Sequence, residues 1–520
     1  MKNNKLLNLA ATLCASVLLT APAFAGIGAR FPSERKVVPD PVTGVPLEVL
    51  TTAEGTGDSK IYQTHHQWTA DGKWLIFRSS RPGSGQAMAV NEETGDIVQV
   101  SSAGYMGMLC VADHSMHLYF LRPERGAGAD IPPPAPPPPA DGAPAAPGGP
   151  GPGGGRGFGP RGPTQVISVD LAKLFADSAA GAMKDATEYE HVCGTIPADV
   201  AAGDMALDPT EDYAYVRTGR EYALKHIAPD TKLEPIFGPR GMGAGPSGLI
   251  SVNLHNGEIK DIVSVPFQMG HVQTNPWTPG EIVFCWETGG KAPQRTWTVR
   301  SDGSGLRPLY PEPAYDWVTH EAVITKDEVA IAILYLRTPL GTRGGGGGNR
   351  QGGAAAAQKD GARGAQKGGP GGPGGQRAAP PPPTPEQAAI LDQTGTDGHA
   401  TGVAIVNLRT REMRIVGQVP LGDPGRSIWH VNGSPDGRWA VADDFQYRLW
   451  IIDRHSGEMK LLADMGHVTS AADHIHPTFN ADSNKIEIQS AMGSKDLHSL
   501  HIVVVPVPQA WLDRKYPANF

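Results

Sequence analysis

The chain has 520 residues, of which 66 are glycine and 48 are proline, and its formal net charge is −8. Residues 126–163 and 341–398 contain much of this glycine and proline, and the rest of the chain has the content of a turn-rich globular protein. A wholly disordered chain is therefore excluded. Neither segment keeps glycine at every third position, which excludes collagen. The charge shows no basic stripe of the kind that binds nucleic acid, so no nucleic-acid partner is expected.

The first 25 residues have the pattern of a secretory signal peptide. Lys2 and Lys5 precede an apolar stretch, and a small residue, Ala25, ends the segment at the expected cleavage site. The apolar stretch is shorter than the roughly 20 residues that a membrane span requires. We therefore expect export to the periplasm or the medium without a membrane span. Cys14 leaves a lipoprotein signal open as an alternative.

A turn containing aspartate or glycine, followed by alternating apolar residues, recurs along the chain and predicts β-hairpins. Seven copies occur, and they span residues 69–77, 112–120, 208–216, 278–285, 325–332, 434–441 and 480–488.

The spacing of these copies predicts the architecture. Neighbouring copies lie about 40–50 residues apart, which is typical of the four-stranded blades of a β-propeller. The two longer gaps contain the segments rich in glycine and proline, so residues 126–163 and 341–398 are predicted to be disordered insertions. The sequence thus predicts an all-β fold, one seven-bladed β-propeller over residues 26–520. Two packed β-sandwiches are the alternative. Short helices are expected at residues 170–180 and 384–391.

Three cysteines remain after signal cleavage, Cys110, Cys193 and Cys285. Their wide spacing gives no CxxC pair and no disulfide framework. One disulfide with one free thiol, or three free thiols, are both open.

Histidines recur just before four of the repeat turns. His474 and His476 stand two apart before the last turn, and on a strand such residues share one face. His430 holds the same place before the preceding turn. Equivalent positions on neighbouring blades converge on the axis of a propeller, so these three imidazoles could bind one divalent cation. His320 and His271 precede two further turns in the same way.

The other histidines are expected to be surface or turn residues. They are His65, His66, His114, His117, His191, His226, His255, His455, His498 and His501.

An ordered set of short segments resembles oligogalacturonate lyases, the seven-bladed propellers of polysaccharide lyase family twenty-two. The resemblance covers residues 36–506 outside the two insertions. The segments are Gly270-His271, Phe284-Cys285, Gln294-Arg295-Thr296-Trp297, Thr319-His320-Glu321, His430, and His474-Ile475-His476-Pro477 with Phe479.

The resemblance implies a manganese-dependent β-elimination on a uronate-containing oligosaccharide. His320 would be the Brønsted base, Arg295 a catalytic or substrate-binding cation, and His271 a residue that lines the substrate site. The implied metal ligands are His430, His474 and His476.

This set of residues suits that chemistry. The proton at C5 of a uronate is a poor acid while the neighbouring carboxylate is anionic. A divalent cation and an arginine neutralise the carboxylate and stabilise the charge that develops. A neutral histidine can then take the proton. The C4–O bond breaks and a 4,5-unsaturated sugar results.

Two positions depart from the family pattern. Ala471 stands where the family has a glutamine ligand, with Asp473 nearby, and Trp286 stands where it commonly has histidine. A lyase fold without activity is therefore an open alternative. Another is a non-catalytic propeller, similar to the scaffold of the Tol system, that binds partners in the periplasm.

Overall fold

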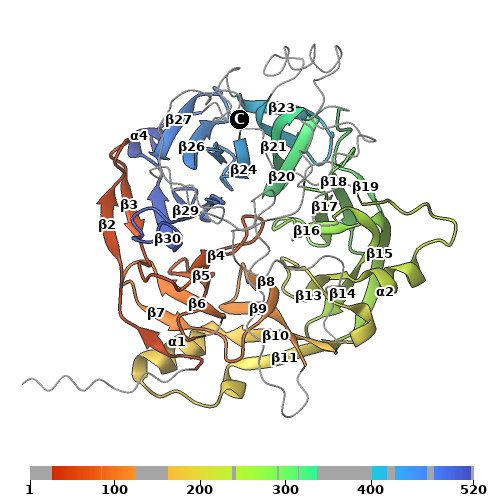
Figure 1. Ribbon diagram of the computed structural model, residues 1–520, viewed down its shortest axis with the longest axis horizontal. Coiled ribbons are helices and arrows are strands. Elements are labelled where there is room, and N and C mark those ends of the chain that lie inside the picture. The colour runs from red at the N-terminus through yellow and green to blue at the C-terminus, as the bar shows by residue number, and fades with distance from the viewer. Residues whose placement is uncertain are drawn as a thin grey trace, which may run out of the picture.

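The chain folds into a ring of seven antiparallel β-sheets, as counted over the residues that the structure describes (Figure 1). The structure is a computed structural model, and the ranges it describes are 26–83, 85–124, 162–236, 242–289, 292–313, 316–336, 401–418, 428–464 and 474–516. The predicted signal peptide, the insertion 341–398, the helix predicted at 384–391 and all but two residues of the insertion 126–163 lie outside these ranges. Within them, no helix is both long and apolar enough to cross a membrane.

Each sheet is one blade, and the predicted seven-bladed propeller is confirmed. Blade 1 comprises β4 Ser59–Lys60, β5 Trp74–Ser79, β6 Gln86–Asn91 and β7 Ile97–Gln99, with β1 Arg30–Phe31 beside β7. Blade 2 comprises β8 Met106–Val111, β9 His117–Pro123, β10 Thr164–Asp170 and β11 Glu190–Ile196. Blade 3 comprises β12 Met205–Leu207, β13 Tyr213–Thr218, β14 Ala244–Asn253 and β15 Ile259–Phe267.

The remaining blades continue around the ring. Blade 4 comprises β16 Met269–Thr274, β17 Glu281–Trp286, β18 Thr296–Arg300 and β19 Arg307–Pro308. Blade 5 comprises β20 Asp316–Thr325, β21 Glu328–Leu336, β22 Gly402–Asn407 and β23 Met413–Gln418. Blade 6 comprises β24 Ile428–Gly433, β25 Trp439–Asp444, β26 Arg448–Asp453 and β27 Met459–Asp464. Blade 7 comprises β28 Thr478–Phe479, β29 Lys485–Ser490 and β30 His501–Pro506.

The two ends of the chain meet in blade 7. The N-terminal strands β2 Lys36–Pro39 and β3 Pro46–Val49 extend the sheet of β28–β30, with Val49 opposite Val503. Figure 1 shows these red strands beside the blue C-terminal ones. A sheet shared between the two ends closes the ring and leaves no gap between the first and last blades.

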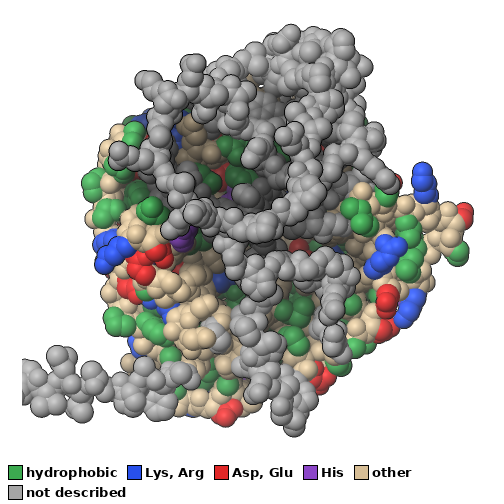
Figure 2. Space-filling view, viewed as in Figure 1, with side chains coloured by type: hydrophobic (Ala, Val, Ile, Leu, Met, Phe, Trp, Pro, Cys, Tyr) green, Lys and Arg blue, Asp and Glu red, His purple; other side chains and the backbone are tan. Residues whose placement is uncertain are grey.

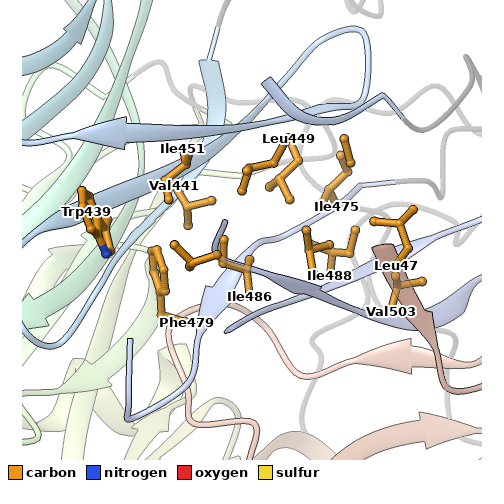
Figure 3. Close-up of a cluster of buried hydrophobic side chains, with 14 of the residues drawn as sticks. Leu47, Trp439, Val441, Leu449, Ile451, Ile475, Phe479, Ile486, Ile488 and Val503 are labelled. Carbon is orange, nitrogen blue, oxygen red and sulfur yellow. The ribbon is translucent and has the colours of Figure 1, made fainter. Parts of the chain in front are cut away.

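The core lies between the faces of neighbouring blades. Figure 3 shows one such layer, in which Ile486 and Ile488 of blade 7 pack against Val441 and Ile451 of blade 6. All four side chains are fully buried. The alternating apolar residues of each repeat supply this layer, since successive side chains of a strand point to opposite faces of its sheet.

The described residues form few helices, and these lie between strands or after the last strand. The helix predicted at residues 170–180 is α1 Leu171–Ala180, where the carboxylate of Asp170 accepts from Lys173 N at the N-terminus. The others in the described ranges are the 3₁₀ helices η1 Ala186–Glu188 and η2 Ala198–Val200, and α2 Arg220–His226 and α4 Gln509–Leu512. Figure 2 shows acidic and basic side chains interspersed around the rim of one face.

Candidate metal centre and active site

The histidines of blades 4 to 7 converge near the axis of the ring, as the repeat position predicts. Centroids of the rings of His271 and His320 lie 6.1 Å apart, those of His320 and His430 4.2 Å apart, and those of His430 and His476 4.1 Å apart. Tyr62 of blade 1 closes the circle, with its ring 5.1 Å from His476 and 4.9 Å from His271. Five aromatic side chains from five blades therefore surround one point.

An irregular backbone turns these side chains inward. The pairing of β16 with β17 shifts register between Gly270 and Gln273, and that of β20 with β21 shifts between Thr319 and Ala322. Inside these bulges, His271 and His320 have φ of 49° and 48°. A β-bulge with a left-handed residue re-aims a side chain that regular pleating would send between blades. Left-handed backbone costs a non-glycine residue energy and is found most often at functional sites.

The strand geometry predicted for His474 and His476 is wrong, although the two imidazoles do come together. The backbone there is irregular, and β28 begins only at Thr478. His476 has φ of 49°, so a left-handed residue and not strand alternation brings its ring toward His430. Ala471 and Asp473 lie outside the described residues.

His430, His474 and His476 form a possible metal centre. Each offers one ring nitrogen, and the three nitrogens all lie within 4.8 Å of one another. That bound includes the roughly 3–3.5 Å expected between two nitrogens that each bind a metal at about 2.1 Å. All three residues are buried, with exposed fractions of 0, 2 and 7%.

The tautomers of two of these imidazoles suit metal binding. His430 Nδ1 lies 2.8 Å from Asp443 Oδ2, and His476 Nδ1 lies 3.0 Å from the carbonyl oxygen of His474. Donation from Nδ1 in each case leaves the lone pair on Nε2, the arrangement that orients metal-bound histidines. Among the described residues, His476 Nε2 is buried without a hydrogen-bond partner. The residues present therefore fit a divalent cation.

Burial controls the charge of this group. Desolvation together with His430 and His474 holds the pKa of His476 well below its usual value, so His476 is neutral at physiological pH. Burial raises the pKa of Asp443 to about 7, although the backbone N–H of His430 donates to its carboxylate. A cation at this point would favour the ionised form of Asp443.

His320 lies beside the three-histidine group with one nitrogen already engaged. Its Nδ1 is 2.7 Å from the carbonyl oxygen of Trp429 and its exposed fraction is 2%. Donation from Nδ1 to that carbonyl fixes the tautomer and leaves Nε2 basic. The ring of Trp429 also contacts the rings of His430 and His474, with centroid distances of 5.2 and 4.1 Å.

Arg295 lies on the other side of His271, in a buried ion-pair cluster. Its Nε donates to Glu321 Oε2 at 2.9 Å, and its Nη2 lies 3.2 Å from His271 Nδ1 and 3.7 Å from Glu287 Oε2. Burial alone would raise the pKa of Glu321, but Arg295 and His271 more than offset this and lower it to about 2. Arg295 is 1% exposed, so it is held rigidly against carboxylates of its own chain.

A second group of potential ligands belongs to the same cluster. His271, Cys285 and Glu287 offer atoms within 4.8 Å of one another. The guanidinium of Arg295 stands among them, and burial raises the pKa of the Cys285 thiol. A fixed cation and a protonated thiol disfavour a metal ion here. Cys110, Cys193 and Cys285 are all free thiols.

The segment between β4 and β5 reaches into the centre of the ring. Gln63 Nε2 donates to Val431 O at 3.2 Å, Asn432 Nδ2 donates to Gln63 O at 3.0 Å, and His65 Nε2 lies 3.0 Å from Met205 O. Blade 1 therefore contacts blades 3 and 6 across the axis. The expectation of a surface or turn residue is wrong for His501, which is 2% exposed on β30, whereas His65 does lie in a turn, although it is only 8% exposed.

Sequence reasoning missed the partners of the histidines, namely Tyr62, Glu287, Glu321, Trp429 and Asp443. Two of them, Glu321 and Trp429, stand next to a site histidine in the sequence, His320 and His430 respectively. The other three come from segments other than those of the histidines they contact.

Replacing Arg295 by methionine is expected to lower the free energy of unfolding by about 3–5 kcal/mol, because Glu321 would stay buried without its partner. Urea unfolding measures the change. Replacing Glu321 by glutamine in the same chain should restore part of the loss. Equal stability of the single variant and the parent protein would contradict the ion-pair role.

The same pair predicts a pH dependence. The pKa of Glu321 is about 2 in the folded protein and about 4.3 in an unfolded chain. The pair therefore stabilises the fold fully above about pH 4.3, and the contribution declines as the pH falls toward 2. The methionine variant should lack this part of the acid dependence.

The fold and this centre define a seven-bladed propeller with a buried cluster of imidazoles at its axis. Two solved structures are similar to it. One is titled "Oligogalacturonate lyase in complex with manganese", with 16% identity, 94% of this chain and 100% of that one covered, and a TM-score of 0.60. The other is an oligogalacturonate lyase from Vibrio parahaemolyticus, with 15% identity, 93 and 100% covered, and a TM-score of 0.59. No family model and no curated protein sequence matches the chain.

Proposed function

We propose that the protein is a metal-dependent lyase that cleaves uronate-containing oligosaccharides, with oligogalacturonate the preferred substrate, by β-elimination. The observation that carries this proposal is the buried group of His430, His474 and His476 with His320 at its edge. The fold that it shares with oligogalacturonate lyases supports it.

A divalent cation at the three histidines would supply positive charge to neutralise the uronate carboxylate. We take manganese as that cation because a similar structure is a manganese complex. Asp443 and the carbonyl of His474 would orient two of the ligands through Nδ1.

His320 is the proposed Brønsted base. Its Nε2 takes the proton from C5, the electron pair of that C–H bond forms the C4–C5 double bond, and the C4–O bond breaks with its electrons on the departing oxygen. The His320 imidazolium then gives its proton, directly or through solvent, to the departing oxygen, and no water is consumed. Because Nδ1 donates to Trp429 O, the imidazole can accept this proton without turning.

Arg295 and His271 complete the proposed site. Glu321 holds both, through Arg295 Nε at 2.9 Å and His271 Nδ1 at 2.9 Å. Any contact that the guanidinium makes with the substrate carboxylate is therefore preorganised, and needs no rearrangement in the transition state. His271 lines the site between this cluster and Tyr62.

We also propose that the protein acts outside the cytoplasm, in the periplasm or the medium, because residues 1–25 carry the pattern of a signal peptide. The substrate there would be an acidic oligosaccharide.

The test is to incubate residues 26–520 with Mn²⁺ and digalacturonate or longer uronate oligomers. Ultraviolet absorbance of the conjugated 4,5-unsaturated product should rise with time, and should not rise in the presence of a chelator. No product from any uronate oligomer would contradict the lyase function and leave a non-catalytic binding propeller in its place.

A further inference from the structure

The three blades that carry no site histidine carry arginines at the same end of the ring. Arg78 of β5 pairs with Ser59, the first residue of β4, and the backbone N–H of Arg217 donates to Asp204 O, just before β12. His271 and His430 each stand third in their strands, β16 and β24, and His320 stands fifth in the longer β20. Arg122, near the end of β9, is the arginine of blade 2. Asp204 also accepts from the backbone N–H of Val272, the residue after His271, so the position of Arg217 adjoins that of His271. Lys60, next to Ser59, donates its backbone N–H to Gln489, which contacts His476 Nδ1, so the position of Arg78 adjoins the metal centre.

Only one of these three arginines is neutralised by a carboxylate within the described residues. Arg122 makes two hydrogen bonds of 2.8 Å to Glu190. Arg78 Nη2 contacts Met108 Sδ at 3.3 Å. The Nε atom of Arg78 is buried and has no hydrogen-bond partner among the residues that the structure describes. Arg217 makes no ion pair with any residue described. A buried guanidinium nitrogen that lacks a partner is costly, so an outside acceptor would be favourable.

Small residues on blade 2 and just before blade 3 link Arg78 to Arg217 through close contacts. A Cβ at Gly203 would lie 2.4 Å from Arg217 Nη2, and one at Gly107 would lie 2.9 Å from the carbonyl of Gly203. Gly107 has φ of +68° and precedes Met108, which contacts Arg78. The glycines therefore make the room in which Arg217 lies against the backbone. Arg78 and Arg217 are both partly exposed.

The nearby carboxylate of Asp204 is directed elsewhere. Its Oδ2 accepts from the backbone N–H of Val272 at 3.3 Å, and its Oδ1 accepts from Met205 N at 3.1 Å. It forms no ion pair with Arg217 among the residues described. The charge on blades 1 and 3 is thus available to an acidic ligand.

We propose that Arg78 and Arg217 form an anion-binding subsite, which takes the carboxylate of a second uronate residue next to the residue that is cleaved. The subsite rests on the proposed lyase function and deepens it, because it makes acidic oligomers better substrates than sugars with one carboxylate. Guanidinium groups bind carboxylates through paired, charge-assisted hydrogen bonds. Arg295 cannot serve two carboxylates, since Glu321 already holds its Nε.

The kinetic test compares the parent protein with Arg78→Gln, Arg217→Gln and the double variant. Loss of a charge-assisted contact predicts that each single variant raises KM for a triuronate by about 10-fold or more, with kcat little changed. A triuronate whose flanking carboxylates are methyl esters should give the parent and the variants the same KM. Lys73→Gln removes an exposed charge at the opposite end of β5 and should leave KM unchanged.

Direct binding separates this subsite from the lyase function. Calorimetric titration of the acidic trisaccharide needs no turnover, and the double variant should bind it at least about 10-fold more weakly than the parent. Arg78→Lys and Arg217→Lys, which keep the charge, should recover part of the affinity. If the parent has no lyase activity but shows this loss, the lyase proposal fails and the subsite stands. Equal affinity in the parent and the double variant would overturn the subsite.

Discussion

Replacing His320 by alanine is expected to lower kcat on a uronate oligomer by about 10²–10⁴-fold, the usual contribution of a general base. The physical reason is that Nε2 of this buried imidazole is the proposed acceptor of the C5 proton. The metal content of the purified variant should equal that of the parent, because the three-histidine group does not include His320. Product absorbance and elemental analysis measure the two quantities.

The backbone at His320 decides which variant is the better control. With φ of 48°, this residue is left-handed, a conformation that asparagine adopts more readily than alanine. His320→Asn should therefore keep the parent's unfolding midpoint and still lose activity. A variant with parental kcat would show that His320 is not the base. Loss of bound metal in either variant would instead make His320 a ligand.

The repeat allowed the ring to be predicted because its signal is local. Each copy places an aspartate or glycine turn before the second strand of a blade, as Asp71 does before β5 and Asp436 before β25. Since all blades are equivalent, a histidine at one position of several copies must face the axis. The repeat symmetry therefore made it possible to predict from the sequence that His271, His320 and His430 meet at the axis.

The backbone that delivers those histidines could not be predicted in the same way. His476 was placed on a regular strand, whereas the structure gives it a left-handed conformation before β28. Left-handed backbone is expected at glycine, and Gly107 of blade 2 is such a residue. At a histidine, the surrounding packing must enforce the left-handed conformation. Packing between blades depends on distant segments and cannot be read from the local sequence.

Contacts between distant segments explain the other omissions. The closing strand β3 pairs with β30 across more than four hundred residues, and the sequence of a strand does not specify which distant strand will pair with it. Tyr62 reaches His271 and His476 from blade 1, and the burial of His65 follows from that same segment. Arg295 was predicted as a cation, but its pairing with Glu321 depends on two neighbouring blades.

Removing one ligand of the three-histidine group is expected to have the second large effect. His430→Ala should abolish stoichiometric Mn²⁺ binding, because it removes one of the three buried imidazoles whose nitrogens lie close enough to share an ion. His430 has no left-handed backbone, so alanine adds no strain there. Titration calorimetry and elemental analysis after dialysis measure the loss without requiring turnover.

Two further variants make this prediction specific. Asp443→Asn keeps the three imidazoles but weakens the contact that fixes His430 Nδ1, and should lower metal affinity by about 10–100-fold. His271→Ala removes an imidazole already engaged by Glu321 and should leave the affinity unchanged. If His430→Ala retained one tightly bound ion, the three-histidine centre would be wrong. If His271→Ala lost it, the cluster around Cys285 and Glu287 would hold the metal instead, because that is the other described group with ligand atoms close enough to share an ion.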